Sequence, residues 1–460
     1  PKSYKSSYNI TTIHYIKNSR TMDYTLNPAY QLSIDFFRPV YTADDWYDYV
    51  VTKAKAKSCE NVRLMNDIDF ADVDVSRIMV TYDFTAKLDG NGKTLSNINL
   101  QKGFKSANNN VRYDLFSKIT GNAEVYNLNL LDYKCGGTYT DRKGKQYVAA
   151  NGAFCYVVEG QVYDVHIQGI ENTSYGTMGG IAAFVQNAGE VKDCSVTASD
   201  SMGVTFTYQE PQNVNSDISL GGIAGNVTNG RITHCFVTDA VITADAMKGS
   251  NGVGAVVGYA SNSVIDTAYA EGSITTRATK VGGIVGQYYA TNASIACVKN
   301  VWAKVDIICS TDMIGELIGQ ANITNDLISS TNNMTGLGVG NVYASNPDIE
   351  NISHTVGNNI AKPISFYGTQ MQLINGASGD GITESEANVV RGLLTYEKLT
   401  ADAGNTYRNT IGFENVYSMD GTADGYMPKM YYDETRKLLP CQKDIKLDDT
   451  DDYNIEVSNV

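Results

Sequence analysis

The sequence predicts an all-β chain organised as a β-solenoid, and three observations support this fold class. A pattern of Gly, an aliphatic residue and a second small residue recurs from Met178 to Gly319. Gly, with 42 residues, exceeds its usual frequency of roughly 7%, whereas Pro, with 8 residues, falls well below roughly 5%. The repeats show no helical period of apolar residues. These features are typical of short strands joined by tight turns.

The chain begins with a segment, residues 1–40, in which polar and apolar residues alternate loosely, as in Tyr30–Phe36. We expect a small β segment or the entry to the solenoid there. Thr42 then precedes Asp44, Asp45 and apolar residues at helical spacing, including Trp46. This N-cap and acidic first turn predict a short helix over 43–55 that covers the end of the β body.

Two strands are expected before the regular repeats. Residues Val62–Phe70 alternate as one strand, and Ala86–Leu95 form a second strand that crosses a sharp Asp-Gly-Asn-Gly turn. Asp114–Ser117 and Gly152–Cys155 read as weaker copies of the repeat, with Phe116 and Phe154 in the aliphatic place. We therefore assign residues 41–325 to the solenoid.

The first column of the repeat starts at a Gly and has an aliphatic residue two positions later. Because residues two apart lie on one face of a strand, the aliphatic residues are expected to stack and the small residues to allow close backbone packing. The Gly residues are Gly179, Gly221, Gly254, Gly282 and Gly315, and the aliphatic residues are Ile181, Ile223, Val256, Ile284 and Leu317.

A second column is apolar at three positions in each of six repeats. It begins at Val125, Val162, Val191, Ile232, Ile265 and Val298, and the positions three and five residues later are also apolar. Parallel, in-register stacking of the repeats follows. Cys194 and Cys235 fall in this column, so we expect them to be neighbours inside the stack, where their small volume is useful.

The pattern fades after residue 321. Residues 322–359, rich in Asn, Ser and Thr, predict a long loop or irregular coils, and 326–442 as a whole is assigned to irregular coils and a C-terminal cap with a short helix near 394–399. Residues 443–460 are predicted to be an acidic linker and the first strand of a further module. The chain is therefore expected to be part of a larger polypeptide.

Charge and composition exclude several classes of partner. The formal net charge of −14 and the lack of clustered Lys and Arg argue against nucleic acid. No run of 18 apolar residues occurs, so membrane insertion is not expected. The eight cysteines form no CxxC pair, which argues against zinc and favours buried free thiols.

The sequence contains no recognisable catalytic constellation. His-Glu-x-x-His, Gly-x-Ser-x-Gly and Walker-type motifs are all absent, and the four histidines are scattered. Asp164, Asp193 and His234 occupy equivalent ladder positions in successive repeats. Asp67 and Asp69 alternate onto one face of a strand and can bind a hard cation such as calcium, although a solvated edge explains them equally. No catalytic residue and no cofactor beyond this possible calcium are predicted.

The repeats resemble the GLUG-motif family of bacterial surface proteins. Leu220–Gly225 and Val281–Gly286 are similar to its signature, and Arg231–Phe236 and Ile265–Ala270 to the strand that follows it. The resemblance implies a right-handed parallel β-helix in a secreted or cell-surface bacterial protein.

The flanking segments resemble the non-catalytic β-helix region of IgA1-specific zinc metallopeptidases. This resemblance covers about residues 60–442 and lacks the catalytic helix, so no peptidase residue is carried over. The similar motifs are Leu64–Phe70, Leu88–Gly92, Asp114–Phe116, Gly425–Lys429 and Leu438–Pro440.

Three functions remain open at this point. The first is a non-catalytic extracellular module, an adhesin or stalk that presents neighbouring domains and binds a host glycoprotein, a glycan or a cell-wall component. The second is the substrate-recognition region of a large secreted zinc metallopeptidase acting on host glycoproteins. The third is a carbohydrate-active β-helix enzyme that uses Asp67 and Asp69.

Overall fold

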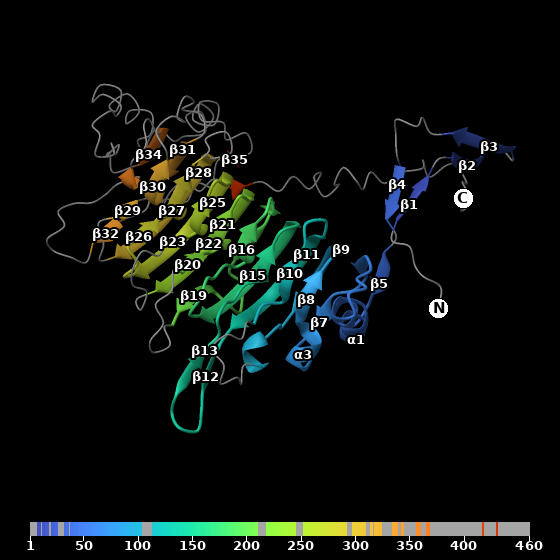
Figure 1. The fold of residues 1–460 in the computed structure, drawn as a ribbon, viewed down its shortest axis with the longest axis horizontal. Helices are drawn as coiled ribbons and strands as arrows, with labels where there is room; N and C mark the ends of the chain where they lie inside the picture. Colours follow the sequence, from blue (N-terminus) through green and yellow to red (C-terminus); the bar gives the residue numbers. More distant parts are fainter. Residues whose placement is uncertain are drawn as a thin grey trace.

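The structure, a computed structural model, describes residues 37–103, 113–209, 218–244, 252–291 and most of 297–323, together with shorter strands nearer both ends. The described part is all-β, and three sheets of parallel strands lie along one elongated stack (Figure 1). Each of the repeats 219–244, 252–276 and 280–309 contributes one strand to each sheet. We call one such set of strands a rung.

The largest sheet has fifteen strands. Its main path runs through β5 (Arg38–Val40), β6 (Val62–Leu64), β9 (Lys87–Ser96), β11 (Glu124–Gly136), β15 (Gln161–Ser174), β17 (Glu190–Lys192), β22 (Arg231–Ala244), β25 (Val264–Thr276), β28 (Cys297–Cys309), β31 (Met334–Gly338) and β34 (Ser365–Gly368). Beside this path lie β7 (Ile68–Asp69), β18 (Ser195–Thr197), β19 (Val204–Tyr208) and β32 (Val342–Ala344).

The second sheet has nine strands and the third has four. The nine are β8 (Val80–Phe84), β10 (Phe116–Ile119), β14 (Cys155–Val158), β16 (Ala182–Gln186), β21 (Ala224–Thr228), β24 (Val257–Ser261), β27 (Val285–Ala290), β30 (Ile318–Ile323) and β33 (Val356–Asn359). The four are β20 (Ser219–Gly221), β23 (Gly252–Gly254), β26 (Lys280–Gly282) and β29 (Met313–Gly315).

The first repeat column lies at a corner between two sheets rather than on one strand. The chain leaves β20 at Gly221, bends at residues 222–223, and enters β21 at Ala224. Ile223 therefore sits at the bend, and its amide donates to the carbonyl of Val256 in the next rung at 3.0 Å. The expectation that the aliphatic and small residues share one strand face was wrong, because the corner changes the direction of the chain between them.

The second column runs in register through the fifteen-stranded sheet. Val125 pairs with Val162, Val162 with Val191, and Ile232 with Ile265, and all of them are fully buried. In five rungs a left-handed residue follows two positions later, at Asn127, Asp164, Asp193, His234 and Thr267, where φ lies between 51° and 54°. This bulge reverses the side-chain alternation, so the residue three positions after the column also points inward.

A helix covers the N-terminal end of the stack. It comprises α1 (Ala43–Trp46), the π-helical segment Tyr47–Val51 and α2 (Thr52–Lys55), in agreement with the helix expected over 43–55. Thr42 and Asp45 form a reciprocal capping box. Trp46 is fully buried, donates from Nε1 to the carbonyl of Ile78 at 3.0 Å, and contacts Phe70 and Phe116 edge to face. Two further short helices are α3 (Val75–Ile78) and the 3-10 turn Leu100–Gly103.

Three local expectations differ from the structure before residue 120. Residues 62–70 form two short strands, β6 and β7, instead of one. The Asp-Gly-Asn-Gly turn is a bulge inside the single strand β9, with positive φ at Asn91 and Gly92. Phe116 pairs with Cys155, so Leu115 and not Phe116 occupies the aliphatic place beside Phe154.

Strands also continue where a loop or irregular coils were expected. Strands β31 and β32 pair with β28, and β33 pairs with β30, so residues 334–359 contribute further strands to the stack. The asparagine-rich composition hid these strands because polar residues dominate between the few apolar ones.

Four small antiparallel pairs complete the described strands. Near the N-terminus β1 (Ser7–Ile10) pairs with β4 (Leu32–Asp35), and β2 (Thr12–Lys17) pairs with β3 (Arg20–Thr25). The hairpin of β12 (Thr138–Thr140) and β13 (Gln146–Val148) projects from the stack, and β35 (Val416–Tyr417) pairs with β36 (Lys429–Met430). The helix expected near 394–399 and the module start in 443–460 lie outside the described residues.

Candidate functional site

The polar residues that the sequence placed in a ladder lie on the outer side of the fifteen-stranded sheet, where the left-handed residues of successive rungs stack. Asn and Asp tolerate a left-handed backbone because a short polar side chain can bond locally. Asp164, Asp193 and His234 occupy these positions in β15, the β17–β18 connection and β22. Their side chains are partly exposed, and each takes part in contacts within its rung or with the next.

One histidine in this ladder, His166, connects a carboxylate to a hydroxyl group. His166 Nε2 lies 3.0 Å from Asp164 Oδ1, and His166 Nδ1 lies 2.8 Å from Ser195 Oγ in the next rung. The order of serine, histidine and aspartate matches the contact pattern of a nucleophile, a general base and its orienting acid. However, Ser195 is only 4% exposed, so its hydroxyl is closed to a substrate. The contacts tie adjacent rungs together.

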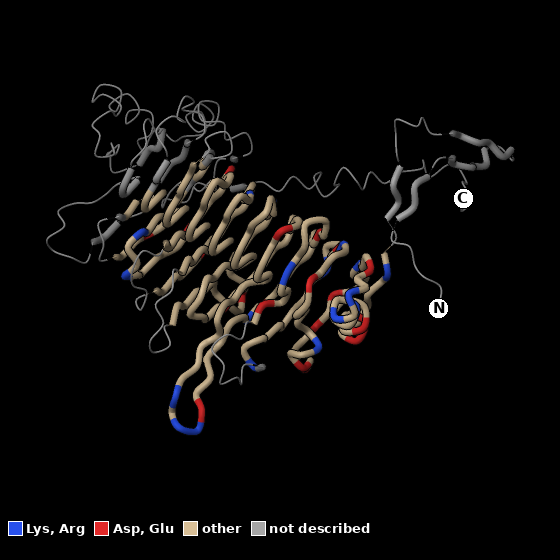
Figure 2. Tube along the Cα trace, viewed as in Figure 1, with Lys and Arg blue, Asp and Glu red and all other residues tan. Residues whose placement is uncertain are grey.

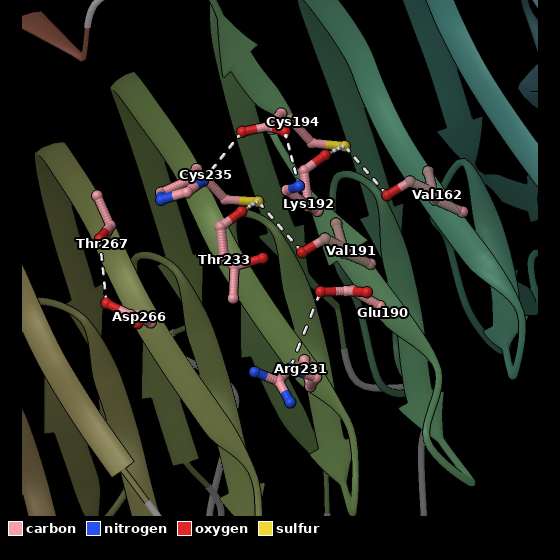
Figure 3. Close-up of polar contacts among 12 residues, drawn as sticks. Val162, Glu190, Val191, Lys192, Cys194, Arg231, Thr233, Cys235, Asp266 and Thr267 are labelled. Atoms are coloured by element: carbon pink, nitrogen blue, oxygen red, sulfur yellow. Dashed lines mark hydrogen bonds and ion pairs between the residues drawn. The ribbon is translucent and has the colours of Figure 1, made fainter. Parts of the chain in front are cut away.

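The neighbouring rung carries a second, similar contact. His234 Nδ1 lies 3.1 Å from Asp193 Oδ1, and Lys192 Nζ lies 3.7 Å from Asp193 Oδ2. Farther along the ladder, Thr267 Oγ1 donates to Asp266 Oδ1 at 3.0 Å (Figure 3). Such partly exposed polar contacts each contribute about 0–1 kcal/mol, so the ladder has a modest stabilising role.

The two cysteines of the second column, Cys194 and Cys235, are fully buried, and Figure 3 shows them in neighbouring rungs. Cys194 Sγ donates to the carbonyl of Lys192 at 3.1 Å, and Cys235 Sγ donates to the carbonyl of Thr233 at 3.3 Å. Burial, and secondarily the adjacent Cys235, raises the pKa of the Cys194 thiol well above its usual value. A protonated, buried thiol is a poor nucleophile and a poor metal ligand.

The candidate calcium ligands are each committed to local hydrogen bonds. Asp67 Oδ1 accepts from the amide of Thr94 at 2.8 Å, and Asp69 Oδ1 accepts from the amide of Ala71 at 3.0 Å and from Asn97 Nδ2 at 2.9 Å. Among the described residues no group of three or more His, Cys, Asp or Glu side chains is arranged to hold a metal ion. The geometry therefore gives the calcium hypothesis no support.

The repeat residues form continuous backbone contacts through the stack. Gly221 pairs with Gly254, Gly254 with Gly282, and Gly282 with Gly315. Gly179 precedes this sheet, at the bridge where Met178 pairs with Leu220. The aliphatic residues Ile181, Ile223, Val256, Ile284 and Leu317 are all fully buried and joined from rung to rung by hydrogen bonds of 2.9–3.1 Å.

Sequence reasoning missed two features of the surface. The contact of His166 with Ser195 depends on the register of two rungs, which no sequence spacing reveals. The β12–β13 hairpin was also missed, although the Asp-Arg-Lys-Gly run at 141–144, a turn signal, could have revealed it. In the part of the chain that is described, no helix is long and apolar enough to cross a membrane.

Comparison with known proteins identifies one family motif. The model of the GLUG motif matches residues 216–243, which comprise β20, β21 and nearly all of β22, so the resemblance to GLUG proteins is confirmed over these residues. No curated protein matches the sequence.

Two solved structures are similar to the chain. A candidate immunoglobulin A1 protease from Bacteroides ovatus matches with a TM-score of 0.43 and 13% identity, over 86% of this chain and 93% of that one. An IgA1 protease matches with a TM-score of 0.42 and 14% identity, over 83% of this chain, which spans 28% of the length of that protein. Both descriptions name an IgA1 protease.

Proposed function

We propose that this chain is a non-catalytic extracellular module of a bacterial secreted or surface protein. In this proposal the sheets form a right-handed β-helix that holds neighbouring domains apart and presents a ligand-binding flank, in the manner of an adhesin or stalk. The observation that carries the proposal is the uninterrupted hydrogen-bonded path from β5 to β34, in which every rung bonds to the next. Such a stack resists bending, since each strand is held on both sides.

The chemistry of the described residues supports a non-catalytic role. The interior columns are apolar and fully buried, and the most triad-like contact contains a serine that a substrate cannot reach. Asp67 Oδ1 and Asp69 Oδ1 accept hydrogen bonds from the amides of Thr94 and Ala71, which is a structural use of these carboxylates. The carbohydrate-active enzyme is accordingly the least supported of the three functions.

The flanking motifs favour a second candidate function. Residues Leu64–Phe70 and Leu88–Gly92, which resemble IgA1-specific metallopeptidases, form part of the first rungs, next to the helical cap. As the substrate-recognition region of a secreted zinc metallopeptidase, the stack would bind a host glycoprotein while another domain cleaves it. Binding without turnover by the isolated chain is the expectation under both candidates.

The purified chain tests the proposal directly. It is incubated with host glycoproteins and bacterial cell-wall polysaccharides while both saturable binding and the release of peptide or sugar fragments are measured. Binding without fragment release is the expected result. Fragment release that disappears in Asp67→Ala, Asp69→Ala or Ser195→Ala would contradict the non-catalytic role.

A further inference from the structure

The hairpin of β12 and β13 is an insertion that the stack does not need. The connection between β11 and β14 comprises residues 137–154, whereas the corresponding connection between β15 and β16 comprises only residues 175–181. The hairpin strands are antiparallel and pair only with each other (Figure 1). Tyr147 and Val148 anchor its base in buried positions, while residues 142–146 are exposed.

The turn at the tip of the hairpin is held in one conformation by Asp141. Its Oδ1 accepts from the amides of Lys143 and Lys145, each at 2.9 Å, and its own amide donates to the carbonyl of Lys145 at 2.9 Å. Gly144 supplies the positive φ of 79° and donates to the carbonyl of Asp141 at 3.0 Å. A preorganised turn loses little conformational entropy when it binds a partner.

The tip is basic on a chain that is acidic overall. Arg142, Lys143 and Lys145 are all exposed, and none of the three forms an ion pair with another residue that the structure describes. In the stack, by contrast, Lys118 pairs with Glu159 at 2.7 Å and Lys134 with Glu171 at 2.6 Å. Figure 2 shows the cations at the end of the projecting hairpin, away from the tan body of the stack. The whole chain carries a formal net charge of −14, so the charge at the tip of the hairpin is opposite in sign to that of the chain as a whole.

An aromatic pair adjoins the basic tip. The rings of Tyr139 and Tyr147 stack with centroids 6.1 Å apart, and Lys145 Nζ lies 4.9 Å from the centre of the Tyr147 ring. Tyr139 is partly exposed, so the tip combines cations with an accessible flat apolar surface. An acidic sugar is complementary to this surface, since it has a carboxylate or sulfate group beside the apolar face of its ring.

We propose that the tip of the β12–β13 hairpin binds an anionic polysaccharide. An acidic peptide would be expected to add a strand to an open edge of the hairpin, but the cations lie in the turn, beyond the last paired residues Thr140 and Gln146. In this proposal the side chains of Arg142, Lys143 and Lys145 each contact an acidic group of successive sugar units. This inference rests on the proposed extracellular function and names the ligand class for one surface of the module.

A matched pair of charge variants tests the inference. In the tip variant Arg142→Gln, Lys143→Gln and Lys145→Gln are combined; the control combines Lys55→Gln, Lys57→Gln and Lys102→Gln, which remove the same charge from exposed positions in the N-terminal part of the chain. Binding of the purified chain to heparin, polygalacturonate, a neutral dextran and poly-glutamate is measured at 50 and 150 mM salt, with the free energy of unfolding as a folding check.

We expect binding to heparin or polygalacturonate that weakens with salt, because the contacts are screened charges. The tip variant should bind about tenfold more weakly than the wild type, and the control should bind as the wild type does. Equal loss in both variants, binding to poly-glutamate alone, or no binding to either anionic polysaccharide would overturn the inference. The proposed function would still stand in those cases if the chain bound another glycoprotein or wall component without turnover.

Discussion

At the scale of single residues, the left-handed positions determine which side chains face the interior. Without the bulge at Asp193, strict alternation would direct Cys194 outward, three positions after the inward residue Val191. The same left-handed backbone conformation occurs in five rungs, at an Asn, two Asp, a His and a Thr residue. The polar side chains at these positions then form the contacts of the outer ladder, so the ladder is a consequence of the bulge and not a collection of catalytic groups.

Glycines in the second strand of each rung allow one rung to approach the previous one. A Cβ added at Gly258 would lie 2.4 Å from the amide nitrogen of Leu220 and 2.8 Å from its carbonyl oxygen. Because these are backbone atoms, Gly258→Ala should lower the free energy of unfolding by about 3 kcal/mol, as overpacking typically does. At Gly203 an added Cβ meets nothing within 4 Å, so Gly203→Ala should change stability by less than about 0.5 kcal/mol. Chemical denaturation of both variants measures the difference, and equal stability would contradict the close packing of rungs.

The buried thiols predict a loss of stability in alkaline solution. Burial raises the pKa of Cys135, Cys155 and Cys194 well above the usual value, so these thiols stay protonated in the folded chain. The unfolded chain releases their protons above about pH 8.5. The contribution of these thiols to the free energy of unfolding is therefore constant below that pH. Above it, this contribution falls by about 1.4 kcal/mol per pH unit for each thiol.

Urea unfolding of the reduced protein between pH 7.5 and pH 10 measures this slope. Cys194→Ala should make the slope shallower by the contribution of one buried thiol. An unchanged slope in Cys194→Ala would show that its thiol ionises equally in both states.

At the scale of elements, the helix over 43–55 covers the first rung and keeps its apolar interior from water. Its boundaries were predictable because the capping residue, the acidic first turn and the apolar spacing are all local in sequence. The contacts of Trp46 with Phe70 and Phe116 were not predictable, since they join segments 24 and 70 residues away in the chain. The aromatic rings fill the end of the core where stacking against a further rung stops.

The capping box provides a test of this element. Thr42→Ala removes the acceptor for the amide of Asp45, which lies 3.1 Å from Thr42 Oγ1, and should cost about 1 kcal/mol of stability. Thr52→Ala, an exposed position inside the same helix, is the control and should be nearly neutral or slightly stabilising. Thermal unfolding followed by circular dichroism compares the two, and an equal effect would argue against a stabilising cap.

At the scale of the whole molecule, the rung is the unit of structure. Arg231 pairs with Val264 and Ile232 with Ile265, so residues 232–264 make up one complete repeat between equivalent points. Deleting them joins Arg231 to Ile265 in the same register. The shortened protein should fold and lose about 4.8 Å of length, the spacing of neighbouring strands.

Small-angle scattering and circular dichroism test this deletion. A second deletion, of residues 232–247, removes half a rung and should prevent folding because the inward and outward columns no longer align. If both deletions unfolded alike, repeats would not be the independent stacking units that the register indicates. Retained binding in the whole-rung variant would additionally place the ligand surface outside residues 232–264.

The sequence by itself determined the class of fold, the helical cap and the identity of the stacked columns, because each depends on periodicity or on local capping. The tertiary structure decided the rest. The corner at Ile223, the one-residue offset at Leu115, the pairing of His166 with Ser195 and the projection of the basic hairpin all depend on which residues of distant rungs meet. Register between rungs is set by the summed packing of many columns, and no single spacing in the sequence carries that information.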